Sequence, residues 1–383
     1  MKNLLFRLIA VIIGFTVAYG LAEIAVRLIS PQETGPSRFA FDSELGDIPV
    51  PQQKARRHYP GVYDFSYSNN SLGFRGSREF GPKQPGDFRI LLLGDSFTYG
   101  LGVNDDQTFA FHLEQYLRQP GLPAAVINAG CPGKGTDYEL KLFQTLGAKL
   151  QPDVTVLCFF CNDFEDNARG DYYYVTADGQ LRGKSLKYNR RGIKSVLLHF
   201  PGYNWLISWS QAANLVKQAA VDYLVKTGQD RGGAAAASGL VVSYGSGFDG
   251  TGFSNDGNRR LTEIYLDHLK EAVRQAHSDL VVFYIPIASE VKTFREKQVS
   301  SRDEQAIKEI IESRGGTLQS LTPLLASAPE PVGELYYAEG HWTPRAHLLA
   351  GRYMGCYIAS QFQAKHLPRG QETARRKGAP EGN

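Results

Sequence analysis

Residues 88–100 read Phe-Arg-Ile-Leu-Leu-Leu-Gly-Asp-Ser-Phe-Thr-Tyr-Gly, and this stretch decides the fold. The almost continuous apolar run Phe88–Leu93 is typical of a strand that is covered on both faces of a parallel sheet. Gly94, Asp95 and Ser96 follow at once, at the end of the strand where open α/β sheets bind ligands. The sequence therefore predicts a reachable hydroxyl, that of Ser96, at the edge of a buried sheet.

Further strand-like segments follow along the chain and alternate with segments that have apolar residues at helical spacing. The predicted strands are Ala124–Asn128, Asp153–Phe160, Leu280–Ile285 and Thr317–Leu321. Strands that alternate with helices predict a parallel, doubly wound sheet with right-handed crossovers. The expected fold class is therefore α/β with a five-stranded parallel sheet, and a last helix is expected from Pro344.

The amino terminus has a different composition. Lys2 and Arg7 precede residues 8–22, which carry no charge, and Glu23 then interrupts the apolar run. Residues 4–28 together supply the roughly 20 residues that a helix needs to cross a bilayer. A cleaved signal peptide is the alternative to a membrane anchor.

No clean small-x-small cleavage site precedes Pro31, which favours an uncleaved transmembrane signal anchor over residues 1–29. The basic residues at its start predict a cytoplasmic amino terminus. The chain is then expected to be a single-pass protein of the inner (cytoplasmic) membrane, with the rest of the chain on the periplasmic, or extracytoplasmic, side.

The rest of the chain divides by composition. The expected segments are an extracytoplasmic preamble at 30–87, the catalytic domain at 88–366 with an insertion at about 165–258, and a disordered tail at 367–383. Within the insertion we expect a hairpin around Asp178-Gly179, helical parts within 193–225 and a flexible loop rich in Gly, Ala and Ser over 231–257. Tyr203, Trp205 and Trp209 could form a lid or a sugar platform, or could simply pack against the sheet.

Charge and cysteine content exclude several classes of protein. The chain has 42 basic and 39 acidic residues and no basic stripe with interleaved aromatics, so no nucleic-acid partner is expected. Four widely spaced cysteines in a long chain do not make a disulfide scaffold. Cys158 and Cys161 have the CxxC spacing, but no second CxxC accompanies them and a zinc site is not expected.

A glycine-rich segment, Asn128–Thr136, follows the second predicted strand. It is not a phosphate loop, because Asn128 replaces the first glycine of that motif and Gly135 stands where Ser or Thr should follow Lys134. A glycine-rich turn that opens a helix still points backbone N–H groups at an anion. Such a turn could therefore stabilise an oxyanion that develops during a reaction.

Two further segments carry side chains that suit acyl chemistry. Asn162 follows the third strand, where its amide could donate to an oxyanion or form an Asx turn. His341 lies just ahead of the helix at Pro344, with Thr343 as the expected N-cap. If this loop is extended, Glu339 points the same way as His341 and can orient the imidazole, as the acid of a hydrolase triad does.

Together these segments resemble the SGNH (GDSL-type) hydrolase superfamily over about residues 88–358, apart from the insertion. Gly94-Asp95-Ser96 is similar to its nucleophile block, and Gly133, Asn162 and His341 fall at its oxyanion and base positions. Residues 69–76 also resemble a preamble found in bacterial membrane-anchored members. The resemblance implies a flavodoxin-like α/β/α sandwich that needs no metal or organic cofactor.

Two departures from the family pattern concern the site. Many members have an acid three residues before the base, where this chain has Ala338, so Glu339 is the expected acid. Cys161 stands where glycine often precedes the asparagine. Its thiol could narrow the pocket or form a disulfide with Cys131.

The resemblance implies an acyl-enzyme mechanism. Ser96 is the expected nucleophile, His341 its general base and Glu339 the acid, while the Ser96 and Gly133 N–H groups and the Asn162 amide hold the oxyanion. We expect a serine esterase that removes an acyl group, such as acetyl, from an envelope glycan or a related ester. An O-acyltransferase acting on polysaccharide hydroxyls and a catalytically idle envelope scaffold are the alternatives.

Overall fold

The computed structural model describes residues 2–118, 122–169, 172–176, 178–186, 202–226 and 253–366. Its centre is a parallel sheet of five strands in the order β11-β10-β7-β5-β6. The strands are β5 (Phe88–Gly94), β6 (Ala124–Asn128), β7 (Val154–Phe160), β10 (Asp279–Ile285) and β11 (Leu318–Ser320). The predicted α/β class and parallel five-stranded sheet are confirmed, and the chain order matches a flavodoxin-like winding.

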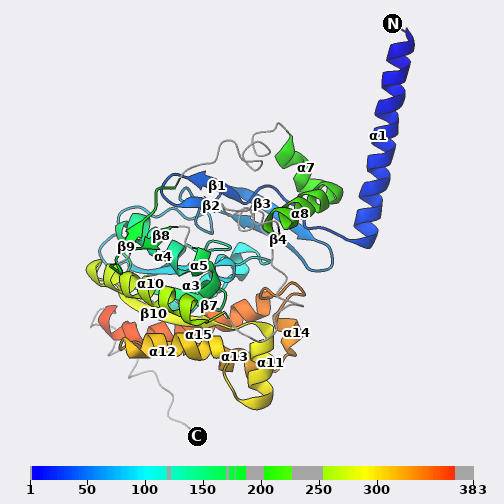
Figure 1. Cartoon of the computed structure of the whole chain (residues 1–383). Helices are drawn as coiled ribbons and strands as arrows, with labels where there is room; N and C mark the ends of the chain where they lie inside the picture. The colour runs from blue at the N-terminus through cyan, green and yellow to red at the C-terminus, as the bar shows by residue number, and fades with distance from the viewer. Residues whose placement is uncertain are drawn as a thin grey trace.

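Helices cover both faces of this sheet (Figure 1). On one face α15 (Pro344–His366) packs on α3 (Phe109–Arg118), and Phe283 of β10 touches two tyrosine rings of α15. On the other face α10 (Asp256–Gln275) packs on α4 (Thr136–Leu142) and α5 (Asp163–Arg169). Of the strands between these two layers of helices, β5, β6 and β7 are buried along their whole length. The continuous apolar runs predict this burial.

Shorter helices complete the domain. They are α2 (Ser96–Tyr99), α11 (Ala288–Lys297), α12 (Arg302–Ser313), α13 (Thr322–Ala326) and α14 (Val332–Leu335). A 3-10 turn occupies Asp105–Gln107, and after α4 the helix widens to a π turn (Phe143–Gly147) and closes with a 3-10 turn (Ala148–Leu150).

The preamble is an ordered unit of two antiparallel hairpins. β1 (Phe39–Asp42) pairs with β2 (Gly46–Pro49), and β3 (Lys54–Tyr59) pairs with β4 (Tyr63–Ser68). Alternate residues of β4 are buried, and they form a small aromatic cluster that also takes in Tyr99 and Leu101 from the catalytic domain. The preamble therefore shares a core with the segment that follows Ser96.

The insertion is described in parts. β8 (Tyr173–Val175) and β9 (Leu181–Gly183) form the hairpin predicted around Asp178-Gly179, and α7 (Tyr203–Trp209) and α8 (Gln211–Lys226) are the helical parts predicted within 193–225. α5 runs across the predicted start of the insertion at residue 165. Most of the predicted flexible loop and the whole predicted tail at 367–383 lie outside the described residues.

The amino terminus is one long helix, α1 (Lys2–Ile29). Over Asn3–Ile29 it is long and apolar enough to cross a membrane, and the most apolar part buries nothing against the rest of the protein. Length and composition fit either a membrane span or a signal sequence. Most of α1 projects away from the body, and only its carboxyl-terminal part approaches α8 (Figure 1).

Candidate active site

The turn after β5 presents one hydroxyl to the outside. Asp95 is the N-cap of α2, and its carboxylate accepts a hydrogen bond from the backbone N–H of Phe97 at 2.9 Å. Within residues 88–103 every residue is buried except Ser96, which is half-buried. The fold therefore encloses this turn and leaves the serine accessible, as the sequence predicts.

Two glycines allow neighbouring segments of the backbone to pack closely against this turn. A side chain at Gly94 would place its Cβ 2.1 Å from the Thr98 hydroxyl, and one at Gly130 would come within 2.3 Å of the Tyr99 nitrogen. The N–H of Cys131 donates to the Gly94 carbonyl at 2.9 Å. The glycine-rich loop after β6 is thus packed directly on the turn that carries Ser96.

The imidazole comes from a tight turn between α14 and α15. The N–H of Gly340 donates to the Tyr337 carbonyl, and the N–H of Tyr337 donates to the His341 carbonyl. Gly340 has φ +106°, in the region that favours glycine. The expectation of an extended loop is wrong: Glu339 reaches His341 because the chain reverses between them.

The helix after this turn begins at Pro344, as predicted. The Thr343 side chain, however, donates to the carbonyl of Glu334 at 2.8 Å. It therefore fastens the turn to α14, and no capping bond from its hydroxyl to α15 is present.

Three predicted side chains meet in one hydrogen-bonded row. Ser96 Oγ lies 2.8 Å from His341 Nε2, and His341 Nδ1 lies 3.2 Å from Glu339 Oε1. The Phe97 ring lies 5.0 Å from the imidazole, centroid to centroid, and His341 is 5 % exposed. Burial of this kind strengthens electrostatic interactions within the row.

Gly133 and Asn162 come from the ends of the strands that flank β5. Gly133 has φ +70°, a left-handed conformation that glycine adopts without strain. Asn162 is buried, and its amide nitrogen donates to Asp166 at 3.1 Å. Because an amide nitrogen carries two hydrogens, Asp166 can hold this side chain while the amide donates to a ligand.

Asp166 is a residue that the sequence analysis missed. It lies four residues after Asn162, in the first turn of α5, and Asn162 directly precedes that helix. The acidic residues in the first turn of that helix are the sequence signal that could have revealed Asp166. Burial raises the pKa of Asp166 to about 7 and outweighs the ion pair with Arg169.

Asp95 is close to the Ser96 hydroxyl but has another partner. Its carboxylate lies 3.4 Å from Ser96 Oγ and 2.9 Å from the Phe97 nitrogen. Burial raises the pKa of Asp95 to about 6, although the Phe97 N–H and the nearby His341 favour its charged form. The geometry supports the expectation that Asp95 fixes the loop.

Lys134 has aromatic partners, and the cysteines form no disulfide. Lys134 donates to the Tyr172 hydroxyl at 2.7 Å and lies over the rings of Tyr138 and Tyr172. All four cysteines are free, so the alternative of a disulfide between Cys131 and Cys161 is not realised. Burial holds the pKa of the Cys131 and Cys161 thiols above its usual range, which makes both poor nucleophiles at neutral pH.

The buried carboxyl of Asp166 predicts a pH-dependent stability. A carboxyl whose pKa is raised on folding stabilises the fold fully below its ordinary pKa near 4, and this contribution is lost as the pH rises through about 7. We expect the free energy of unfolding, measured in detergent, to be lower at pH 8 than at pH 5. Asp166→Asn should shrink this difference by on the order of 2 kcal/mol.

The amide that replaces the carboxyl in this variant still accepts a hydrogen bond from Asn162. Asp95 and Glu290, whose pKa values burial raises to about 6 and about 7, keep the remaining pH dependence in the same direction. An Asp166→Asn variant with the full wild-type difference between pH 5 and pH 8 would contradict the assignment to Asp166.

Comparison with known proteins agrees with this arrangement. The model of the GDSL-like lipase/acylhydrolase family matches residues 92–349, more than half of the chain. The chain therefore belongs to this family. The class of protein that this membership defines is an ester hydrolase. A comparison with curated proteins gives no match.

Solved structures that match this chain share little sequence with it. A two-domain esterase active on acetylated mannans is 11% identical, with a TM-score of 0.40 over 74% of this chain and 51% of its own, so the match spans about half of that protein. A lipase/acylhydrolase from Enterococcus faecalis is 14% identical, with a TM-score of 0.37 over 72% of this chain and 96% of its own. The esterase EstA from Pseudoalteromonas sp. is 12% identical, with a TM-score of 0.37 over 72% and 98%.

Proposed function

We propose that the protein is a serine esterase that works through an acyl-enzyme. The observation that carries the proposal is the row from Ser96 to Glu339, with separations of 2.8 and 3.2 Å at the two hydrogen bonds of His341. In this mechanism His341 takes the proton of Ser96 while the serine oxygen attacks an ester carbonyl. The protonated imidazole then gives that proton to the departing alcohol.

The second half of the reaction uses the same groups. A water molecule loses a proton to His341 and attacks the acyl-enzyme, and the serine leaves with the proton from the imidazole. The Ser96 and Gly133 N–H groups and the Asn162 amide are the donors for the oxyanion at both steps. Their origin at the ends of β5, β6 and β7 supports this assignment.

The proposed role of Glu339 as the acid of the triad can be tested separately. Glu339→Gln keeps the size of the side chain but presents an N–H to His341 Nδ1. The ring would then carry its proton on Nε2 and donate to Ser96, so it could no longer act as base. We expect kcat to fall by roughly 10³- to 10⁴-fold, measured with a short-chain aryl ester.

Glu339→Asp is the matched variant, because it keeps the charge on a side chain that is one methylene shorter. It should retain more activity than Glu339→Gln. If Glu339→Gln and wild type have equal kcat, Glu339 is not the acid of the triad.

We further infer that the substrate is an ester of the cell envelope, such as an acylated, in particular acetylated, glycan. The support is α1, which is long and apolar enough to cross a membrane, and the basic residues Lys2 and Arg7, which favour a cytoplasmic start. The catalytic domain would then lie on the periplasmic side. Analysis of acetate release from acetylated envelope glycans, with and without an acceptor polysaccharide, tests this proposal. Transfer of the acyl group to the acceptor would favour an O-acyltransferase over a hydrolase.

A further inference from the structure

The helical part of the insertion is fastened to α1 by a buried carboxylate. Glu23 accepts hydrogen bonds from the Ser210 hydroxyl at 2.8 Å and from the backbone N–H groups of Gln211 and Ala212, both at 3.0 Å. These N–H groups belong to the first turn of the 16-residue helix α8. Glu23 therefore caps α8 from another helix, and it is only 7 % exposed. The sequence analysis read this residue as an interruption of the apolar run.

Other residues at the end of α1 extend this attachment. Arg27 donates to Glu23 at 2.8 Å and to the carbonyl of Trp209, the last residue of α7, also at 2.8 Å. Just after α1, the N–H of Gln32 donates to the Gln211 side chain at 3.1 Å. The bonds of Glu23 and Arg27 need the helix to stay joined to the mature protein, which favours an anchor over a cleaved leader.

The two faces of α8 are reversed relative to a helix of a water-soluble protein. Its described buried residues are Gln211, Ala212 and Asn214, two of them polar. Its outward face carries an exposed apolar stripe at helical spacing: Val216, Ala219, Ala220 and Tyr223. Val216 is 70 % and Tyr223 63 % exposed. A helix packed on a protein core normally has its apolar stripe on the inside.

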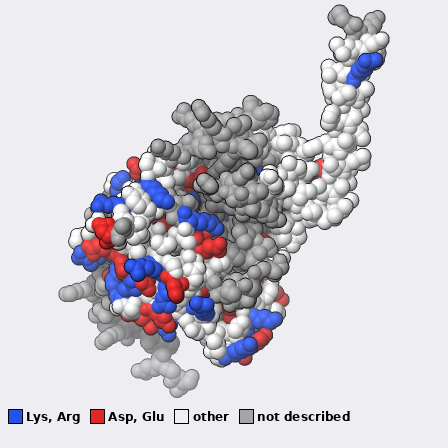
Figure 2. Space-filling model, viewed as in Figure 1, with Lys and Arg blue, Asp and Glu red and all other residues white. Residues whose placement is uncertain are grey.

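α7 adds two tryptophans to this apolar surface. Trp205 is 66 % and Trp209 37 % exposed, and their rings lie 5.2 Å apart. α7 and α8 lie beside the end of α1, where the uncharged run 8–22 gives way to Glu23 and Arg27 (Figure 1). In Figure 2 the charged side chains gather over the body of the domain, and the described surface beside α1 is mainly uncharged.

We propose that the α7–α8 pair lies on the outer surface of the membrane that α1 crosses, with Trp205, Trp209 and the stripe of α8 immersed at the boundary of headgroups and acyl chains. Tryptophan and tyrosine concentrate at this depth because their rings are apolar with one polar group. An amphipathic helix binds in the plane of this boundary through its apolar face. The proposal rests on the membrane anchoring proposed above and replaces the lid or sugar platform as the role of this region.

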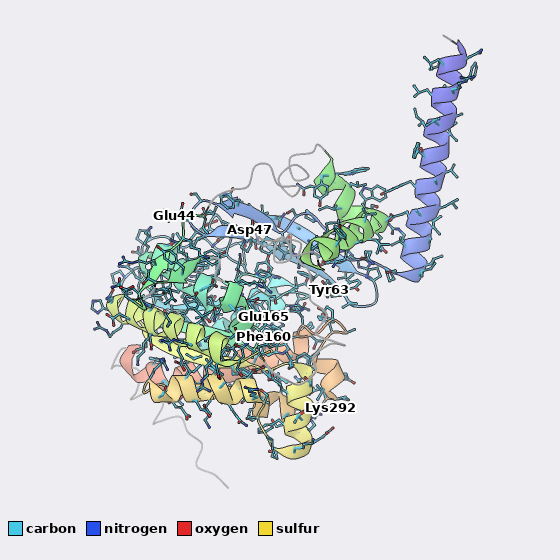
Figure 3. All side chains as sticks on the ribbon, in the orientation of Figure 1. Glu44, Asp47, Tyr63, Phe160, Glu165 and Lys292 are labelled. Carbon is cyan, nitrogen blue, oxygen red and sulfur yellow. The ribbon has the colours of Figure 1, made fainter. Side chains whose placement is uncertain are left out.

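Contacts continue from this pair of helices to the triad. The N–H of Gly35 donates to the Ile207 carbonyl at 3.4 Å, and the nearby Glu33 accepts from the Tyr63 hydroxyl at 2.9 Å. The Tyr63 ring, labelled in Figure 3, packs at 5.7 Å on that of Tyr337, two residues before Glu339. The membrane contact would therefore hold the catalytic edge at a fixed height above the bilayer, suited to esters near the membrane surface.

The native tryptophans allow a direct test with the full-length protein. The chain has three, and Trp342 is fully buried, so changes in emission report on Trp205 and Trp209. The protein is reconstituted in phosphatidylcholine vesicles with bromine on the acyl chains near the headgroup, and in matched vesicles without bromine. We expect the brominated lipid to quench most of the emission of the two exposed tryptophans and iodide in the buffer to quench little of it.

Two variants make the test specific. Glu23→Leu keeps α1 apolar enough to insert but removes the cap, so iodide quenching should rise while the protein resists carbonate extraction. Val299→Trp places a tryptophan at an exposed site outside the insertion, 52 % exposed in the wild type, and this residue should stay accessible to iodide.

The readouts separate the possible failures. Equal iodide quenching of Trp205 and Trp209 in vesicles and in detergent, in a protein that resists carbonate extraction, would overturn the membrane contact alone. Release by carbonate would overturn the anchor and the contact together. Quenching by brominated lipid in a protein without aryl esterase activity would support the contact and overturn the esterase.

Discussion

Replacing Ser96 by alanine is expected to lower the turnover of a short-chain aryl ester by roughly 10³- to 10⁶-fold. The variant loses the oxygen that lies 2.8 Å from His341 Nε2, and no other described hydroxyl is hydrogen-bonded to that nitrogen. The fold should be intact, since the Ser96 side chain is half-buried and the cap of α2 comes from Asp95. The purified variant should therefore unfold at the same temperature as the wild type.

A fluorophosphonate provides the second readout, because it forms a stable adduct with an activated serine. We expect one adduct on the wild type, located at Ser96 by mass spectrometry, and none on Ser96→Ala. Ser360→Ala is the matched control, since this exposed serine lies more than four turns along α15 from Pro344. Full turnover by Ser96→Ala would rule out the acyl-enzyme mechanism, and a wild type without adduct or turnover would favour an idle scaffold.

The parts of the fold that the sequence predicts well are those with local signals. Ala124–Asn128 is a strand with the predicted bounds, and the strand after α10 begins one residue earlier than predicted, at Asp279. Buried parallel strands have continuous apolar runs whatever lies around them, and glycines mark the turns that follow. In a parallel sheet the carboxyl ends of the strands lie at one edge. Ser96 and Asn162, which each follow a strand, could therefore be expected at the same edge.

The features that the sequence analysis missed depend on contacts between distant segments. Glu23 looks like a charge within an apolar run, and only the position of α8 turns it into a cap. The reach from Glu339 to His341 depends on the positive φ of Gly340, which two-residue spacing does not reveal. Asp166 was missed because the segment after Asn162 was assigned to an insertion, although it continues the core as α5.

The second large effect is expected at Arg75, in the preamble segment 69–76. Its side chain is buried and donates to three backbone carbonyls, those of Tyr99, Gly100 and Val103, at 2.7 to 3.1 Å. It also pairs with Asp105 at 2.6 Å. Tyr99 is the last residue of α2 and the other two residues follow it, so Arg75 supports the turn that carries Ser96.

Arg75→Met removes this donor and leaves the buried carbonyls and Asp105 without it. The Asp105 side chain is 39 % exposed and keeps its bond from Ser68, so the main cost lies with the carbonyls. Each buried acceptor left unsatisfied costs about 1–3 kcal/mol, so the total is a large part of the roughly 5–15 kcal/mol that stabilises a typical domain. We expect a loss of this size in the free energy of unfolding, measured with urea in detergent. In the fraction that folds, kcat should fall, because Ser96 loses the support of its turn.

Arg78→Met is the matched control, since Arg78 is exposed in the same preamble and pairs with Glu114 at 3.3 Å. Exposed ion pairs contribute about 0–1 kcal/mol, so this variant should differ little from the wild type. Arg75→Lys keeps the charge but loses the planar fork that serves several acceptors at once, and it should fall between the two. If Arg75→Met is as stable and as active as Arg78→Met, the preamble is a spacer. If it loses both stability and kcat, the preamble belongs to the same folding and functional unit as the segment that carries Ser96.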